Sequence, residues 1–136
     1  MRGSWDRRRV IAIAVGGAAG ATLRWALVTS VESGRFPWPV FALNVVGSVL
    51  LGVLLAVEWS PARIALHDAG GIGFCGGLTT FSTFSLEVVD LARDGNTGLA
   101  ITYTAVSVLA AVLGIAAGAG ALRRLRAITI PLETEP

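Results

Sequence analysis

The sequence predicts an all-α membrane protein that crosses the bilayer with four helices and forms a single domain over residues 1–136. The chain is 54% apolar and only 15% charged, whereas ordinary soluble domains are about 45–50% apolar and about 25% charged. Its 17 glycines are also more typical of transmembrane helices than of soluble ones. Long stretches with few or no charges nearly exhaust the chain, and a helix needs about 20 apolar residues to cross a bilayer. These observations argue against a soluble enzyme.

The four expected spans cover residues 10–31, 36–57, 67–92 and 96–122. The connectors between them are too short to fold alone, so no soluble domain is expected. Basic residues 7–9 and the apolar run after them also resemble a secretory signal peptide, but a cleavable apolar core is usually shorter than this run. A retained first helix is the simpler interpretation.

The charge distribution predicts an orientation in the membrane. The net charge is +2 and arginine supplies all 11 basic residues, which at first suggests a nucleic-acid partner. Position argues against this, because the arginines lie mainly at span ends, where they mark the cytoplasmic side and meet anionic lipid headgroups. Four spans place both termini on one side, and eight arginines belong to that side: Arg2, Arg7, Arg8, Arg9, Arg63, Arg123, Arg124 and Arg126. The opposite side has only Arg35 and Arg93, which predicts cytoplasmic termini and a fixed orientation.

The first span contains a single charge. Ala12, Gly16, Gly20 and Arg24 recur every four residues and therefore share a helix face on which small residues permit close packing. A charge within a span is costly unless it reaches water, the interface or a partner. Arg24 is therefore either an anchor that reaches the headgroups or a functional residue, and both interpretations remain open.

The second span contains a single amide among apolar residues. Asn44 shares its face with Gly47, Ser48 and Gly52. It either joins helices through a hydrogen bond worth about 1 kcal/mol or presents its NH₂ group to an anion in a pore. The fourth span likewise has a narrow, partly hydroxylated face suited to close packing, formed by Tyr103, Ser107, Ala111, Gly114 and Gly118.

The third span is the most informative. Residues 70–87 read GGIGFCGGLTTFSTFSLE, and such a concentration of glycine, serine and threonine disfavours a continuous helix. We expect a broken helix, with the break near residues 76–79. At membrane depth, non-helical backbone is tolerated only when it is buried in protein or lines a cavity, and carbonyls at such breaks coordinate cations in transporters. The break is therefore a candidate cation site.

The residues after the expected break combine rings with hydroxyls. Phe81 and Phe84 are three apart and face the same way, while Thr80, Thr83 and Glu87 form an adjoining stripe. Two phenylalanines at helical spacing are usually core residues, but hydroxyls on a glycine-broken span favour a pore.

Catalysis has no candidate residues. The chain contains no carboxylate pair, nucleophile triad, phosphate-binding loop or metal-ligand spacing. Cys75 is the single cysteine, which excludes an intrachain disulfide, and we interpret Cys75 and His67 as structural.

Taken together, these features resemble the Fluc fluoride channel family, also called CrcB. The resemblance covers essentially the whole chain and is carried by GGAAGATLRW (16–25), LNVVGS (43–48), GFCGGLTTFSTFS (73–85) and the pair Tyr103 and Ser107. It implies a passive channel that exports fluoride through the plasma membrane of a prokaryote and lowers its toxicity.

The resemblance also implies an assembly and a set of site residues. Two chains associate in antiparallel orientation and enclose two pores, with a structural sodium ion held by the main-chain carbonyls of Gly76 and Thr79. Phe81 and Phe84 match the phenylalanines whose ring edges face fluoride, and Asn44 matches the pore asparagine. Five further positions match residues near the pathway: Thr80, Ser82, Thr83, Tyr103 and Ser107. Where the family can show another serine, this chain has Ala111, and we expect Arg24 and Glu87 in structural or vestibule positions.

The sequence leaves alternatives for the partner of the chain and for its function. A chain of fixed orientation requires an oppositely oriented homologue as its partner, whereas the family suggests an antiparallel homodimer. A small four-helix multidrug exporter has the same size, but its mechanism needs a membrane carboxylate early in the chain, where this sequence has Arg24; Glu87 lies near a span end. A membrane assembly subunit that transports nothing is the other alternative.

Overall fold

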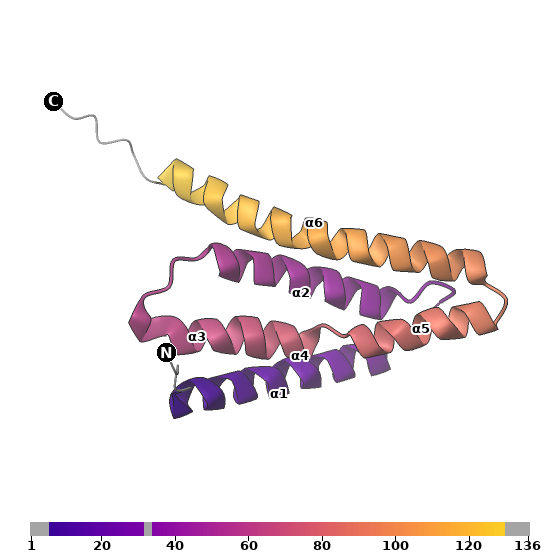
Figure 1. Cartoon of the computed structure of the whole chain (residues 1–136), viewed down its shortest axis with the longest axis horizontal. Helices are drawn as coiled ribbons and strands as arrows, with labels where there is room; N and C mark the ends of the chain where they lie inside the picture. The colour runs from indigo at the N-terminus through magenta and orange to yellow at the C-terminus, as the bar shows by residue number, and fades with distance from the viewer. Residues whose placement is uncertain (1–5, 32–33, 130–136) are drawn as a thin grey trace, which may run out of the picture.

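The computed structural model describes residues 6–31 and 34–129, and every regular element in this part of the chain is helical. Four segments are long and apolar enough to cross a membrane, which confirms the predicted all-α membrane fold (Figure 1). Three of them are continuous helices: α1 (Arg7–Ser30), α2 (Trp38–Ala56) and α6 (Thr97–Thr129). The third span consists of η1 (Pro61–Arg63), α3 (Ile64–Asp68), η2 (Ala69–Cys75), α4 (Gly76–Leu78) and α5 (Phe81–Arg93).

Two spans extend by at least six residues beyond the apolar stretches that predicted them. The third span begins at Pro61 rather than at residue 67, and α6 continues to Thr129 rather than ending at residue 122. Both extensions are rich in alanine, leucine and arginine, which are strong helix formers. Hydropathy therefore locates the part of each helix that is apolar enough for the bilayer but not the end of the helix.

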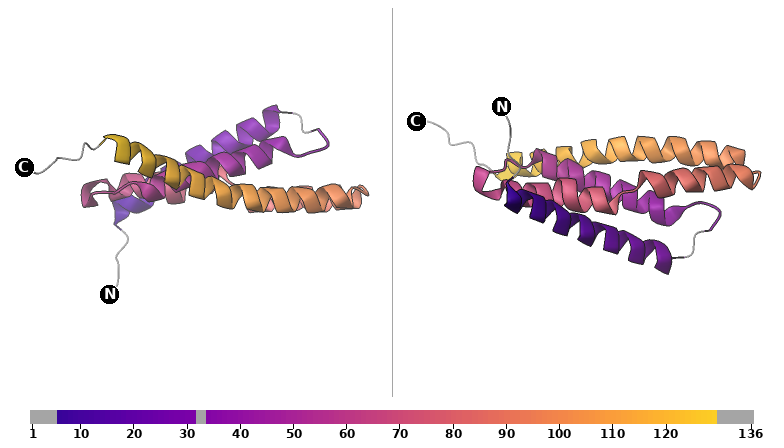
Figure 2. Two further views of the ribbon diagram at one scale, coloured as in Figure 1. Left: turned by 90° about the horizontal axis from the view of Figure 1, so that it is seen from above. Right: turned by 60° about the horizontal axis from the view of Figure 1, so that its bottom comes forward.

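The third span changes its neighbour along its length. Its first half, from α3 through α4, packs along α1, whereas α5 packs along α6. Helix α2 packs along α6 and also contacts η2, α4 and α5. It therefore lies between α6 and the first half of the third span (Figures 1 and 2). The interruption between α4 and α5 is the point at which the third span leaves α1 for α6.

Glycines bring α1 and the third span into backbone contact. A Cβ atom at Gly16 would overlap the carbonyl oxygen of Ala69, and one at Gly20 would overlap that of Phe74. On the facing side, a Cβ atom at Gly77 would overlap the carbonyl oxygen of Gly17. This confirms the close-packing face predicted for the first span, because no side chain fits between the two backbones.

The second and fourth spans approach each other in the same way. A Cβ atom at Gly52 would overlap the carbonyl oxygen of Ile115, and one at Gly118 would overlap that of Val49. Nearer the beginnings of α2 and α6 lies a small core of Val40, Phe84 and Tyr103. Large apolar side chains elsewhere on the helices are exposed, as expected for surfaces that face lipid or a partner chain.

Candidate functional site

The break in the third span lies at two threonines. Thr79 (φ −78°, ψ 153°) and Thr80 (φ −146°, ψ 123°) are both extended, and helix α5 begins at Phe81. The broken helix is therefore confirmed, but the glycines of residues 70–77 lie in helix, mostly in the wide turns of η2, rather than in the break. Contact with the α1 backbone holds this segment helical against its low propensity, since tertiary packing overrides propensity.

Asn44 binds the backbone of Thr80 at the break from the α2 side. The Thr80 N–H donates to Asn44 Oδ1 at 2.8 Å, and Asn44 Nδ2 donates to the Thr80 carbonyl oxygen at 3.1 Å. An amide NH₂ group has two N–H donors, and the second one has no hydrogen-bond partner among the described residues. Asn44 thus joins two helices, as one interpretation predicted, and retains an N–H donor that the other interpretation requires.

Arg24 reaches the same break from the α1 side. Its Nη1 donates to the carbonyl oxygen of Thr79 at 3.0 Å, and the residue is half-buried. The charge of the first span therefore ends on a main-chain carbonyl of the third span rather than at the headgroups. This contact assigns Arg24 a structural partner that the sequence did not indicate.

Hydroxyls cap the helix that follows the break. Thr80 Oγ1 accepts a hydrogen bond from the Thr83 N–H at 3.1 Å, as an N-cap residue does. The same oxygen lies 3.1 Å from Thr83 Oγ1 and 3.2 Å from Ser82 Oγ. Thr80 and Thr83 of the predicted stripe are therefore joined, with Ser82, at the first turn of α5, whereas Glu87 pairs with Tyr103.

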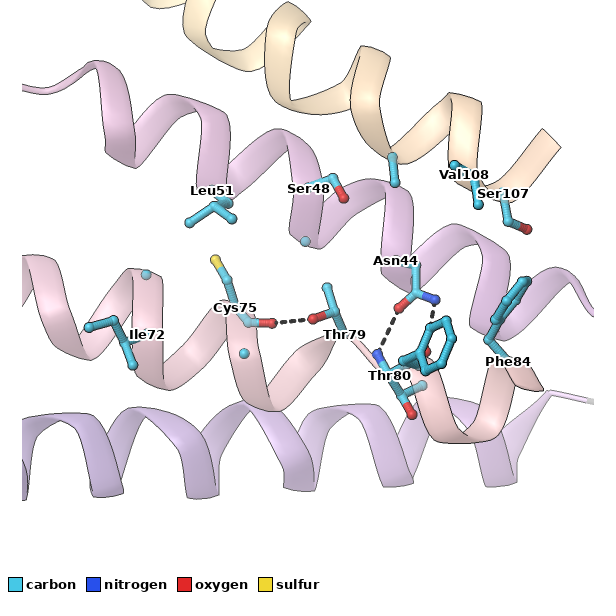
Figure 3. A pocket seen from close by; sticks show the side chains of 15 residues that line it. Asn44, Ser48, Leu51, Ile72, Cys75, Thr79, Thr80, Phe84, Ser107 and Val108 are labelled. Carbon is cyan, nitrogen blue, oxygen red and sulfur yellow. Dashed lines mark hydrogen bonds between the residues drawn. The ribbon is translucent and has the colours of Figure 1, made fainter. Parts of the chain in front are cut away.

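A groove of about 390 Å³ runs beside the break (Figure 3). It lies between the third span, α2 and α6, on the side of the third span that is away from α1. The predicted site residues that line it are Asn44, Gly76, Thr79, Thr80, Phe81, Phe84 and Ser107. Ala111 also lines the groove, at the position where the family resemblance allows a serine.

The two phenylalanines are neighbours with different surroundings. Their ring centroids are 5.8 Å apart and both rings border the groove. Phe84 is only 8% exposed and packs against Tyr103, with ring centroids 5.1 Å apart, whereas Phe81 is 79% exposed. Phe84 is therefore both a core residue and a wall of the groove, while Phe81 is free of the core of this chain.

Ser107 has a buried hydroxyl with no partner. Its side chain is 8% exposed, its Oγ forms no hydrogen bond with any described residue, and the residue lines the groove. An unsatisfied buried polar group costs about 1–3 kcal/mol, so its presence calls for an explanation. A ligand or water in the groove that accepts this hydroxyl hydrogen would satisfy it.

Five predicted site residues do not line the groove. Tyr103 is fully buried and donates its hydroxyl hydrogen to Glu87 Oε2 at 2.6 Å, behind Phe84. Ser82 and Thr83 belong to the hydroxyl network of α5, as described above. These residues support the wall of the groove, as Arg24 does from α1.

The sequence did not predict one ion pair, whose carboxylate is buried. Arg9 Nε donates to Asp68 Oδ2 at 2.5 Å, and the Asp68 side chain is 4% exposed. His67 Nδ1 lies 3.3 Å from the other oxygen of Asp68, and its ring packs against Trp59. The pair joins the first turn of α1 to α3. Asp68 is one of several acidic residues at the arginine-rich end of the bundle, with Asp6 and Glu58, and its partner is 59 residues away in sequence, so the sequence did not single it out.

Four membrane-spanning helices with a polar break at mid-length and a groove beside it define a multi-pass membrane protein with the features of an ion pore. Residues 11–119 match the family described as CrcB-like protein, Camphor Resistance (CrcB). The chain belongs to this family, which confirms the resemblance drawn from the sequence.

Relatives with assigned names match most of the chain. A protein of Mycobacterium tuberculosis named fluoride-specific ion channel FluC 1 is 38% identical over 125 residues, which is 89% of this chain and 95% of the relative. A protein of Novosphingobium aromaticivorans named fluoride-specific ion channel FluC is 44% identical over 82% of this chain and 93% of its own length. Fluoride-specific ion channel FluC 2 of Bacillus subtilis is 40% identical over 86% of this chain and 89% of its own length. These names are those of channels and not of enzymes, in agreement with the prediction.

Proposed function

We propose that this protein is a passive, fluoride-selective ion channel. The observation that carries the proposal is the composition of the groove. The unpartnered hydroxyl of Ser107, the free N–H of Asn44 and the rings of Phe81 and Phe84 all border one space. The names of the relatives, which match over most of their lengths, support the same function.

The chemistry of the groove suits a small anion. Fluoride is strongly hydrated, so a selective pore must replace its waters with other donors. Hydroxyls, amide N–H groups and the positive edges of aromatic rings are such donors. Among the described residues, no arginine lines the groove. This favours conduction, because a fixed cation at a narrow point would retain the ion, whereas a channel must release it.

The direction of transport follows from the membrane potential. The proposal places the protein in the plasma membrane of a prokaryote with both termini in the cytoplasm, because the arginines gather at the end of the bundle where α1 begins and α6 ends (Figure 1). Arg2 lies outside the described residues. With the cell interior negative, each 100 mV favours anion exit by about 2.3 kcal/mol, so a passive pore clears fluoride from the cytoplasm.

The proposal includes an antiparallel partner. Gly76 and Phe81 border the groove and are both exposed, so a single chain leaves this side of the pathway uncovered. A partner seated here would complete the wall. It is either a second copy of this chain or a homologue of opposite orientation.

A structural sodium ion, which is not transported, belongs to the same proposal. The Thr80 N–H donates to Asn44 and not to the Gly76 carbonyl, which it would meet in a continuous helix. The Thr79 carbonyl accepts from Arg24, but a carbonyl oxygen has two lone pairs and retains one. Gly76 and Thr79 therefore fit such an ion, whose charge would offset the partial negative charges of these carbonyls at an interface between two chains.

Anion efflux from liposomes that contain the purified protein tests the function. We expect fluoride release without chloride release, from the chain alone or after an oppositely oriented homologue is added, in the absence of any proton gradient or nucleotide. Fluoride release that requires a proton gradient would instead indicate a coupled transporter. The absence of any fluoride release, with or without a homologue added, would contradict the proposal and favour an assembly subunit.

A further inference from the structure

We infer that Arg24 is a positioning residue that holds the break of the third span in place and thereby orients Asn44 at the groove. The role of Arg24 in transport rests on the proposed function, whereas its role in holding the break rests on contacts in the structure. It differs from the simpler idea that Arg24 attracts anions through its charge.

The first step concerns the Thr79 carbonyl. In a continuous helix this oxygen would accept from the Thr83 N–H, but that N–H donates to Thr80 Oγ1 instead. The Thr79 carbonyl is thus left without its helical partner, and Arg24 Nη1 donates to it at 3.0 Å. Arg24 is the only side chain among the described residues with a recorded hydrogen bond to this oxygen.

The second step concerns the packing of α1 next to Arg24. Gly20 lies one turn before it on α1, and a Cβ atom at Gly20 would overlap the Phe74 carbonyl oxygen and lie within 2.8 Å of the Leu78 nitrogen. The α1 backbone is therefore pressed directly against the last helical turn before the break. Arg24 lies one turn further along α1, so its backbone is held close to the break and its guanidinium group reaches the Thr79 carbonyl.

The third step links Arg24 to Asn44. The Thr79 carbonyl and the Thr80 N–H belong to the same planar peptide group, so a bond that holds the carbonyl also fixes the direction of the N–H. Asn44 is bound to both the N–H and the carbonyl of Thr80, so its orientation follows that peptide. The break is thus held from two sides, by Arg24 from α1 and by Asn44 from α2, and only Asn44 borders the groove.

Hydrogen exchange of the full-length protein provides a readout that does not depend on transport. Thr80 N–H is protected by Asn44 Oδ1, so Asn44→Ala defines the exchange rate of the unprotected amide. We expect Arg24→Met to accelerate exchange at Thr80 by about tenfold or more, because the break loses one of its two supports. Arg35→Met is the matched control: it removes the same charge from the connector between α1 and α2, away from the break, and we expect no change at Thr80.

Fluoride efflux then separates positioning from charge. If Arg24 acts through Asn44, the double variant Arg24→Met with Asn44→Ala conducts as Asn44→Ala does alone. If Arg24 acts by attracting anions, the two losses multiply, and the inference is overturned. Unchanged exchange at Thr80 in Arg24→Met also overturns it. Should Arg24→Met fail to fold, Arg24→Gln, which keeps a polar but shorter side chain, replaces it with the same expectations. A wild-type protein that carries no fluoride would refute the proposed function while leaving the exchange result intact.

Discussion

Asn44 and Thr80, which belong to different spans, form a two-way hydrogen-bonded pair in which the amide accepts from the Thr80 N–H at 2.8 Å and donates to the Thr80 carbonyl at 3.1 Å. This pair replaces the helical bonds that the break removes. It also leaves one amide N–H of Asn44 at the groove, so the same side chain stabilises the fold and offers a donor to an anion.

Asn44→Asp tests that donor with an almost isosteric side chain. The variant keeps an oxygen for the Thr80 N–H but replaces both N–H donors with an acceptor and adds a negative charge. We expect fluoride efflux to fall by at least about tenfold, since 1.4 kcal/mol of lost stabilisation already corresponds to that factor. Efflux from liposomes measures this, and an unchanged rate in a folded variant would remove Asn44 from the pathway.

Ser107→Ala separates stability from transport. Removal of a buried hydroxyl that has no partner removes an unsatisfied polar group, so the melting temperature should stay the same or rise. Fluoride efflux should nevertheless decrease, because the groove loses a donor. Ser85→Ala is the matched control on the third span: Ser85 Oγ donates to the Phe81 carbonyl within its own helix and lies outside the groove, so its efflux should equal that of the wild type. Equal efflux from both variants would show that the Ser107 hydroxyl is not used.

The phenylalanines differ in what their replacement by isoleucine should change. Phe81 is 79% exposed, so Phe81→Ile should alter the free energy of unfolding by no more than about 0.5 kcal/mol. Phe84 is buried against Tyr103, so Phe84→Ile should cost about 1 kcal/mol or more through repacking. Both variants should lose most fluoride efflux, since both lose a ring edge at the groove. Full efflux from folded Phe81→Ile would show that the exposed ring is not part of the pathway.

Two adjacent glycines distinguish the fold of one chain from its association with another. A Cβ atom at Gly77 would overlap the Gly17 backbone, so Gly77→Ala should lower the melting temperature of the chain. At Gly76 an added Cβ would meet no described atom within 4 Å beyond its own helical neighbours, so we expect Gly76→Val to leave the packing between the helices of a single chain unchanged. If a partner covers the break, Gly76→Val should weaken association, measured by size-exclusion chromatography with light scattering. Association equal to that of the wild type would exclude a partner at this position.

The arginine distribution predicts a fixed orientation. Reporter fusions at the C-terminus should show one population, in the cytoplasm. If the orientation is fixed, the chain purified alone should conduct poorly until an oppositely oriented homologue is added. Substantial populations on both sides of the membrane, together with fluoride efflux from the chain alone, would instead indicate an antiparallel homodimer.

The four spans, the break in the third and the close-packing glycine faces were all predictable from the sequence. They follow from local properties: the length of uncharged stretches, the low helix propensity of glycine and serine, and the recurrence of small residues at helical spacing. The residues of the candidate groove were also identifiable, since Asn44 and Ser107 are polar residues on otherwise apolar spans.

Only the tertiary structure decided where the third span breaks and which residues support the break. Glycines at residues 70–77 remain helical because the α1 backbone lies against them, and the interruption falls at Thr79 and Thr80, where the span moves from α1 to α6. The partners of Arg24 and Asp68 could not be predicted from the sequence either, because each bond joins residues more than fifty positions apart. Periodicity describes the faces of single helices, whereas the choice of neighbour depends on how those faces fit together in space.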